Sequence, residues 1–374
     1  PSRRFFELCV KQQGTCPLQL SIDEDEDVLD AVLDIYEEID TMKNDCAEEW
    51  MQLTGIETPS LALRPLLGLL VRDSSTRALV PSILGRMHRC SSKDRQELGL
   101  VLGPLLQQMI QNAGGTTALE NSKVTTSPKG SLELLENAQL TTSAVSSIDT
   151  LEYLLISYSE LWAKPSPTEI EIGELYMNGV FSLGFATLSQ FCLLSGNLDP
   201  TRDDRDPACS HLSQDLDDIS GLNISQSFTY DVDELYNNTA SVPPNTTLLI
   251  INGGLDFQTP WEFGRYQFES TALSDPETSR KMLVEYEFGA HVCGLATTTD
   301  DDDTVCGPSI VASFISNNGN PDAIDTSCMS DLPELLLTDD DFSILVERII
   351  EAEREEMLES GFGFERTKLT RTGT

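Results

Sequence analysis

Apolar positions repeat with a helical period through most of the first part of the chain. From residue 27 they recur every three or four residues, with Asp and Glu on the opposite face, which predicts an amphipathic helix. The apolar positions are Val28, Val32, Ile35 and Ile39. Shorter apolar helices are predicted over residues 59–71 and 78–87, and a longer one begins at Ser92. Pro104 lies inside that longer pattern and predicts a kink or a break.

The pattern fades after this helix and returns in shorter pieces. Residues 114–150 are rich in Ser, Thr, Gly and Asn, which is typical of a long loop. Residues 169–195 predict one or two amphipathic helices, and residues 307–315 predict another helix. Residues 341–358 predict a charge-rich amphipathic helix, followed by a tail that we expect to be disordered.

Two apolar runs of a different kind lie between these helices. Residues 248–251 and 282–288 have the composition of buried strands, and each is followed by a loop that contains glycine. The first loop carries Asp256 and the second carries His291. A strand, an acid, a helix, a strand and a histidine in this order predict a parallel pair with Asp256 and His291 at neighbouring strand ends.

The helix between these strands has a start signal of its own. Thr259 and Glu262 form a Thr-x-x-Glu capping box, and Pro260 occupies the position expected for the first helical residue. We therefore expect Thr259 to cap this helix.

An acid and a histidine in this arrangement supply two of the three parts of a nucleophile triad. The acid would fix the tautomer of the imidazole, and the histidine would take a proton from a serine hydroxyl. The alternative is that Asp256 only forms a turn and that His291 is only exposed. His88, in a short helix, and His211, in an acidic loop, are weaker candidates. The chain has no G-x-S-x-G sequence to supply the serine.

Charge excludes several classes of partner. The chain of 374 residues has a net charge of −38, which argues against binding to nucleic acid or to anionic membranes. No signal peptide and no apolar run long enough for a bilayer are visible. Residues 300–303 are four aspartates, but they lack the spacing of a calcium loop. No G-x-G-x-x-G, Walker or H-E-x-x-H sequence is present, so we expect no cofactor and no metal.

The cysteines and the glycosylation sequences favour an oxidising, secretory environment. Nine cysteines occur without a C-x-x-C pair, so at least one thiol stays unpaired. The short-range candidates for disulfides are Cys9–Cys16, Cys192–Cys209 and Cys306–Cys328. Three acceptor sequences for glycosylation begin at Asn223, Asn237 and Asn245. We therefore expect an extracellular protein whose signal peptide is not in this chain.

Several of these segments resemble one enzyme family. The residues are 252–260, reading NGGLDFQTP; 289–291, reading GAH; 5–9, reading FFELC, with Cys16; Arg89-Cys90 with Asp94; and 159–162, reading SELW. They are similar to α/β-hydrolase serine peptidases related to prolyl and tripeptidyl aminopeptidases, of the extracellular type. The likeness covers residues 1–333. It implies that Asp256 and His291 are catalytic, and that Glu160 and Trp162 bind the free amine and an apolar part of a peptide substrate. The alternative for Glu160 is that it only caps a helix or lies on the surface.

The resemblance also implies that part of the fold lies outside this chain. The nucleophile elbow and the first six strands of such enzymes would precede Pro1. We therefore expect a truncated α/β-hydrolase fold, with a helical lid and the last two strands of the parallel sheet. Residues 1–163 would form the lid, residues 164–334 the lid return and the Asp and His loops, and residues 335–374 a separate amphipathic helix and tail.

The expected function is that of the C-terminal part of a secreted serine exopeptidase without its nucleophile. The alternatives are an inactive relative that serves as an interaction module, and an esterase or lipase of the same fold. The expected partners are a peptide substrate and the missing N-terminal half of the fold. Two strands leave an unpaired edge, so we expect the chain alone to be marginally stable or prone to aggregate. We also expect no labelling of this chain by a fluorophosphonate.

Overall fold

The computed structural model describes residues 1–12, 14–20, 27–42, 44–112, 148–182, 187–199, 201–209, 227–236, 238–297, 299 and 305–359. Within these residues a helical unit, a small aromatic cluster and an α/β unit each have a hydrophobic core. The predicted loop at residues 114–147, the tail from residue 360, His211, Asn223 and Asn237 lie outside the described residues. None of the described helices is long and apolar enough to cross a membrane.

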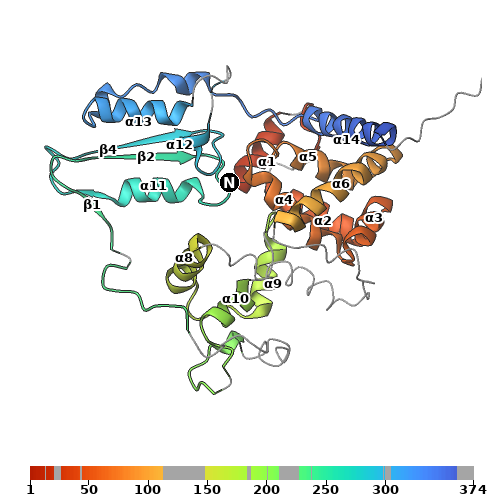
Figure 1. The fold of residues 1–374 in the computed structure, drawn as a ribbon, viewed down its shortest axis with the longest axis horizontal. Coiled ribbons are helices and arrows are strands. Elements are labelled where there is room, and N and C mark those ends of the chain that lie inside the picture. Colours follow the sequence, from red (N-terminus) through yellow and green to blue (C-terminus); the bar gives the residue numbers. More distant parts are fainter. Residues whose placement is uncertain are drawn as a thin grey trace, which may run out of the picture.

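The helical unit contains most of the first 112 residues and one helix from the end of the chain (Figure 1). Its helices are α1 (Ser2–Lys11), α2 (Val28–Met42), α3 (Asp45–Thr54), α4 (Pro59–Arg72), α5 (Leu79–Arg89), α6 (Ser92–Asn112) and α14 (Asp340–Glu359). The amphipathic pattern of α2 is confirmed, because Val28, Val32, Ile35 and Ile39 are all buried. α6 continues through Pro104 without a break, since a proline inside a long helix removes one backbone hydrogen bond and leaves the others.

The last helix, α14, packs against α5 and α6 and belongs to the core of the helical unit. Leu337 and Phe342 are fully buried there. Arg86 of α5 holds Asp339, just before α14, with nitrogen–oxygen distances of 2.5 and 2.6 Å. The guanidinium of Arg86 also lies 4.0 Å from the centre of the Phe342 ring. The sequence predicts that residues 335–374 are separate from the lid. Residues 335–346 instead pack into the core of the helical unit.

The middle of the chain forms a smaller cluster below the sheet in Figure 1. Its elements are α8 (Ile148–Ile156), η2 (Ser157–Leu161), α9 (Glu169–Asn178), α10 (Thr187–Leu194) and η3 (Pro207–Cys209). Tyr158, Trp162 and Phe191 form its aromatic core, with Trp162 stacked on Phe191 at 4.5 Å between ring centroids. The predicted helical segment 169–195 is therefore a pair of helices, α9 and α10.

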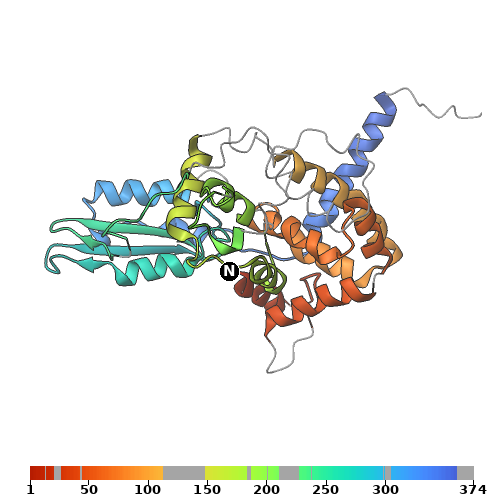
Figure 2. The ribbon, with the colours of Figure 1, turned by 90° about the horizontal axis from the view of Figure 1, so that it is seen from below.

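The α/β unit has the strand–helix–strand order that the sequence predicts. Its elements are β1 (Ser241–Val242), β2 (Thr247–Gly253), α11 (Trp261–Ser270), β3 (Ala272–Leu273), β4 (Arg280–Tyr286), α12 (Cys293–Ala296), α13 (Cys306–Ser316), η5 (Pro321–Ala323) and η6 (Ser327–Asp331). β2 and β4 pair in parallel, from Thr247 opposite Arg280 to Gly253 opposite Tyr286. β1 and β3 form a second, shorter parallel pair. α11 and α13 cover opposite faces of the sheet (Figures 1 and 2).

The two main strands are only partly covered. The apolar residues 248–251 of β2 are all half-buried, and α11 has no buried residue. Phe263 and Tyr266 of α11 are 67% and 69% exposed. Parallel sheets are normally covered on both faces and extended by further strands. This unit therefore has more apolar surface than its own helices and strands can cover.

The prediction that Thr259 caps α11 is wrong. Pro260 is the N-cap residue, and no side chain caps the helix. Thr259 instead donates its hydroxyl proton to Asp256 at 2.6 Å. The carboxylate of Asp256 competes successfully for the same hydroxyl, because it forms an Asx-type turn with the backbone N–H groups of Gln258 and Thr259.

Eight of the nine cysteines pair. The three predicted disulfides, Cys9–Cys16, Cys192–Cys209 and Cys306–Cys328, are confirmed. A fourth joins Cys46 of α3 to Cys90 at the end of α5. Cys293 is free and buried. Four disulfides are typical of proteins from oxidising compartments.

Candidate functional site

The carboxyl ends of β2 and β4 bring Asp256 and His291 together. Asp256 lies three residues after Gly253, the last residue of β2, and it is only 5% exposed. His291 lies in the loop of residues 287–292 between β4 and α12, and its side chain is 37% exposed. His291 Nδ1 lies 3.0 Å from Asp256 Oδ2. The proximity of the two side chains follows from the parallel pairing that places both strand ends at one edge of the sheet.

Two glycines let the loops approach each other closely. A Cβ atom at Gly253 would lie 2.6 Å from the carbonyl oxygens of both Gly289 and Ala290. A Cβ atom at Gly254 would collide with the carbonyl oxygen of Glu287. The loops are also joined by backbone hydrogen bonds from Gly254 N to Tyr286 O (2.7 Å) and from Leu255 N to Gly289 O (3.0 Å). The backbones around Asp256 and His291 therefore form one interlocked pair.

Hydrogen bonds fix the carboxylate of Asp256. Oδ1 accepts from the backbone N–H groups of Gln258 at 2.8 Å and of Thr259 at 2.9 Å. Oδ2 accepts from the hydroxyl of Thr259 and faces His291. Burial by itself would raise the pKa of Asp256, but the hydrogen bonds from Thr259, His291 and Gln258 outweigh it, so the pKa is lowered from its ordinary value. Asp256 is thus held as a carboxylate.

The same hydrogen bonds select one tautomer of His291. The single hydroxyl proton of Thr259 goes to Asp256, so the Thr259 oxygen, 3.2 Å from His291 Nδ1, can only accept there. The carboxylate of Asp256 also only accepts. The proton between these groups therefore belongs to Nδ1, and Nε2 of the neutral ring has a free lone pair. This is the arrangement that a general base requires.

The residue after His291 has a strained backbone. Val292 has φ 59° and ψ 26°, in the left-handed region that a β-branched residue rarely adopts. Its side chain is 51% exposed, so little burial compensates for the strain. Such strain persists only where surrounding contacts fix the backbone.

Three arginines of the helical unit donate to the Asp and His loops. Arg4 of α1 reaches the carbonyl of Gly254 at 3.3 Å, and Arg72 at the end of α4 reaches the side-chain oxygen of Gln258. Arg77, between α4 and α5, donates to the carbonyl of Phe288 at 3.0 Å.

Aromatic packing adds to these contacts. Phe257, next to Asp256, packs edge-on against Phe5 of α1 and against Phe181. The helical unit is thereby attached to the loops on both strands.

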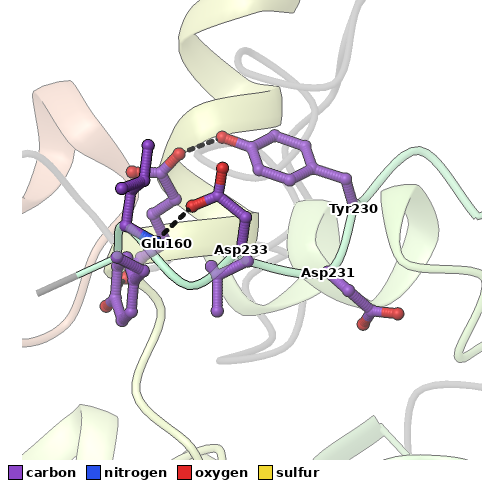
Figure 3. A pocket seen from close by; sticks show the side chains of 7 residues that line it. Glu160, Tyr230, Asp231 and Asp233 are labelled. Carbon is purple, nitrogen blue, oxygen red and sulfur yellow. Dashed lines mark hydrogen bonds between the residues drawn. The ribbon is translucent and has the colours of Figure 1, made fainter.

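Glu160 lies in a different place. It lines an open cavity of about 330 Å³ with Tyr230, Asp231, Val232, Asp233, Leu235 and Tyr236. Tyr230 donates its hydroxyl proton to Glu160 Oε1, and the two side chains point toward each other, whereas Asp231 points away (Figure 3). Neither Asp256 nor His291 lines this cavity. The structure therefore does not bring Glu160 to the acid and the histidine.

Trp162 does not line the cavity either. Its ring is stacked in the aromatic core, and its Nε1 donates to Ser166 Oγ at 2.7 Å. Glu160 and Trp162, which we expect to bind two parts of one substrate, therefore do not line the same cavity. Local sequence does not distinguish Asp231 and Asp233 as site residues, because they lie in an acidic stretch of the chain that resembles a solvated loop.

The remaining candidates are distributed over the surface. Asn245, the described residue of the three glycosylation candidates, is exposed just before β2. His88 pairs with Glu38 at 2.5 Å on the surface of the helical unit.

The free cysteine and the described acidic side chains offer no further site. Burial raises the pKa of the Cys293 thiol to about 11, so this cysteine stays protonated at neutral pH. Among the described residues, no group of three or more His, Cys, Asp and Glu side chains could hold a metal ion.

Comparison with protein-family models, with curated proteins and with solved structures finds no match to this chain. The likeness to serine peptidases therefore depends on the motif residues themselves. Of these, Asp256 and His291 lie together, while Glu160 and Trp162 lie in a separate cluster.

Proposed function

We propose that this chain is the C-terminal part of a secreted serine hydrolase with a truncated α/β-hydrolase fold, most consistent with an exopeptidase that removes residues from peptide N-termini. The observation that carries the proposal is the contact of 3.0 Å between His291 Nδ1 and Asp256 Oδ2 at the ends of parallel strands. In this proposal Asp256 orients the imidazole, and His291 is the general base. The serine comes from a segment outside this chain.

The chemistry follows from the tautomer of His291. Nε2 accepts the proton of the serine hydroxyl as the serine oxygen attacks the substrate carbonyl. The imidazolium formed in this step is stabilised by the carboxylate of Asp256, which its hydrogen bonds keep ionised. The same proton then passes to the leaving amine, and water repeats the cycle on the acyl-enzyme.

The half-covered sheet supports an incomplete fold. β2 pairs with β4 on one side, and its apolar residues 248–251 are only half-buried. Further parallel strands beside β2 would cover this surface and satisfy the backbone groups of its other edge. In this proposal those strands belong to the same part of the enzyme as the serine.

Labelling by a fluorophosphonate tests the proposed triad. The complete hydrolase should be labelled on a serine outside residues 1–374, and His291→Ala should abolish the labelling. His88→Ala is the matched control, because this histidine also pairs with a carboxylate but lies on the helical unit. Labelling that survives His291→Ala, or labelling of a serine within this chain, contradicts the proposal.

Absence of labelling would favour the alternative of an inactive relative. The observation behind this alternative is that no described serine hydroxyl is hydrogen-bonded to His291; its hydroxyl neighbour is that of Thr259. In the inactive relative, the acid–histidine pair would remain as a structural hydrogen bond. An esterase would be labelled as well, and it would prefer short acyl esters to aminoacyl amides.

The cavity at Glu160 suggests where a substrate amine binds. The carboxylates of Glu160 and Asp233 favour a cationic group, and two tyrosines offer it aromatic faces. Glu160→Gln should raise KM for peptides with a free amine and spare N-blocked esters. Glu152→Gln, which removes an exposed carboxylate from α8, is the control. An equal loss on both substrates would remove Glu160 from this role.

A further inference from the structure

Arg77 is a buried cation with an incomplete set of partners. It lies in the turn between α4 and α5 and is 1% exposed. Its Nη1 donates to the carbonyl of Phe288, while Nε and Nη2 have no hydrogen-bond partner among the described residues. Burial lowers the pKa of Arg77 to about 10, which remains far above neutral pH. Among the described residues Arg77 forms no ion pair within 4.0 Å, and the carboxylates of Asp73 and Asp256 act on its charge only from a longer distance. A buried charge without a direct ion pair is unfavourable inside a protein.

The acceptor of this buried cation lies close to His291. Phe288 is three residues before His291, in the loop that also contains the strained Val292. Within the loop, the carbonyl of Gly289 accepts from Leu255, and the carbonyl of Ala290 accepts from Cys293. These bonds come from the α/β unit. The bond from Arg77 fixes the carbonyl of Phe288, just before these two, and it comes from the helical unit.

We propose that Arg77 is a positioning residue for His291, through which the helical unit sets the orientation of the imidazole toward Asp256. This inference rests on the proposed function, in which that orientation makes His291 a base. This role also explains why Arg77 is buried. The loop that contains the strained Val292 keeps one conformation only if its contacts are fixed, and Arg77 supplies one of these contacts. Displacement of the turn between α4 and α5 would then release His291.

The other two arginines do not have this role. Arg4 and Arg72 donate to Gly254 and Gln258, on the Asp256 side of the interlocked loops. Asp256 also keeps three hydrogen bonds within residues 256–259, so it does not depend on the arginines for its position. His291 has no comparable local network. Arg77 is therefore the arginine whose hydrogen bond lies on the His291 side of the loops, while its charge acts on Asp256 without a direct contact.

Nitrogen NMR of the histidine side chains tests this inference on the chain itself. In the wild type, His291 should show a protonated Nδ1 with a hydrogen-bonded proton signal, and an unprotonated Nε2. Arg77→Met should abolish the Nδ1 proton signal, because the loop that carries His291 then loses its donor from the helical unit. Arg77→Lys, which keeps one donor near Phe288, should restore part of the signal.

Arg265→Met is the matched control. Arg265 is an exposed arginine that binds Glu285 of β4 through Nε (2.9 Å) and Nη2 (3.0 Å), without a contact to the His291 loop. Its removal should leave the signals of His291 unchanged. Equal effects of the two substitutions, or an unchanged Nδ1 signal in a folded Arg77→Met chain, would overturn the inference. If Arg77→Met does not fold, the shorter Arg77→Gln is measured in its place, and an unchanged Nδ1 signal in that folded chain has the same force.

The outcome is separable from that of the proposed function. If Arg77→Met releases His291 but the complete hydrolase is not labelled, the positioning role stands and the serine hydrolase is excluded. If the complete hydrolase is labelled and Arg77→Met leaves both the labelling rate and the His291 signal unchanged, the triad stands and the positioning role is wrong.

Discussion

Replacement of Asp339 by asparagine should detach the last helix from the helical unit. Asp339 receives two hydrogen bonds from Arg86, at 2.5 and 2.6 Å, and one from Ser82 at 2.8 Å. Asparagine is nearly isosteric and can still accept from Ser82. Its amide group, however, turns two N–H donors toward Arg86 and removes the negative charge. The substitution therefore tests the ion pair without creating a cavity.

The magnitude follows from the unequal burial of the two partners. Arg86 is 3% exposed, whereas the side chain of Asp339 is 44% exposed. Breaking a fully buried ion pair costs about 3–5 kcal/mol, and an exposed pair contributes about 0–1 kcal/mol. Arg86 also keeps Glu97, at 3.1 Å, as a partner. A cost of about 2 kcal/mol lies between these limits, and it corresponds to a roughly 30-fold faster opening of α14.

Hydrogen exchange measures this opening directly. The amides in the first turns of α14 should exchange roughly 30-fold faster in Asp339→Asn, while those of α2 and α4 stay unchanged. Asp340→Asn is the control, because the side chain of the exposed Asp340 has a hydrogen bond only to Thr338 among the described residues. A change in α14 of less than twofold, or an equal change in the control, would refute the reasoning about Arg86 and Asp339.

Acid should have the same effect as the substitution. The hydrogen bond from Arg86 lowers the pKa of Asp339 from its ordinary 3.8. A carboxylate with a lowered pKa contributes its stability above the pKa of the unfolded chain and loses it as the pH falls through the lowered value. Exchange of α14 in the wild type should therefore begin to speed up as the pH falls below the ordinary pKa of 3.8, and it should match that of Asp339→Asn only below the lowered pKa.

Three further substitutions test other parts of the structure. Val292→Gly should raise the unfolding free energy by about 1 kcal/mol, because glycine adopts positive φ without strain; a lower urea midpoint would contradict this. Cys46→Ser opens a loop with a sequence separation of 44 and should cost about 4 kcal/mol, against about 2.5 kcal/mol for Cys9→Ser with a separation of 7. The urea midpoint of unfolding should therefore be lower in Cys46→Ser than in Cys9→Ser. Gln12→Leu should cost about 1–3 kcal/mol and speed exchange just before α14, where its side chain bonds the backbone; unchanged exchange would exclude this role.

Local patterns predict the acid–histidine pair well. The apolar strands, the glycine loops and the order of Asp256 and His291 all lie within about fifty residues of sequence, and parallel pairing then determines that the two side chains meet. The cap of α11 is wrong because Thr259 has two possible partners, and the pattern alone does not rank them. The carboxylate of Asp256 is the stronger acceptor and takes the hydroxyl.

Contacts over long separations were not predictable in this way. Arg77 and Phe288 are 211 positions apart, and nothing near Arg77 distinguishes it from a surface arginine. The same is true of Arg86 and Asp339, 253 positions apart, so the docking of α14 was missed. The disulfide Cys46–Cys90 was missed because its separation of 44 residues is no shorter than those of several other possible pairs. Such contacts depend on how whole helices pack.

The amide of Gln12 determines how far the α/β unit can swing. The connection from η6 to α14 covers residues 332–339, which could span roughly 30 Å when extended. Gln12 binds the carbonyl of Leu335 at 2.8 Å and the N–H of Leu337 at 2.7 Å, so only residues 332–334 stay free as a tether. Their reach is roughly 10 Å. After any separation the two units would remain at a high effective concentration, and reclosure would be a short intramolecular step rather than a search.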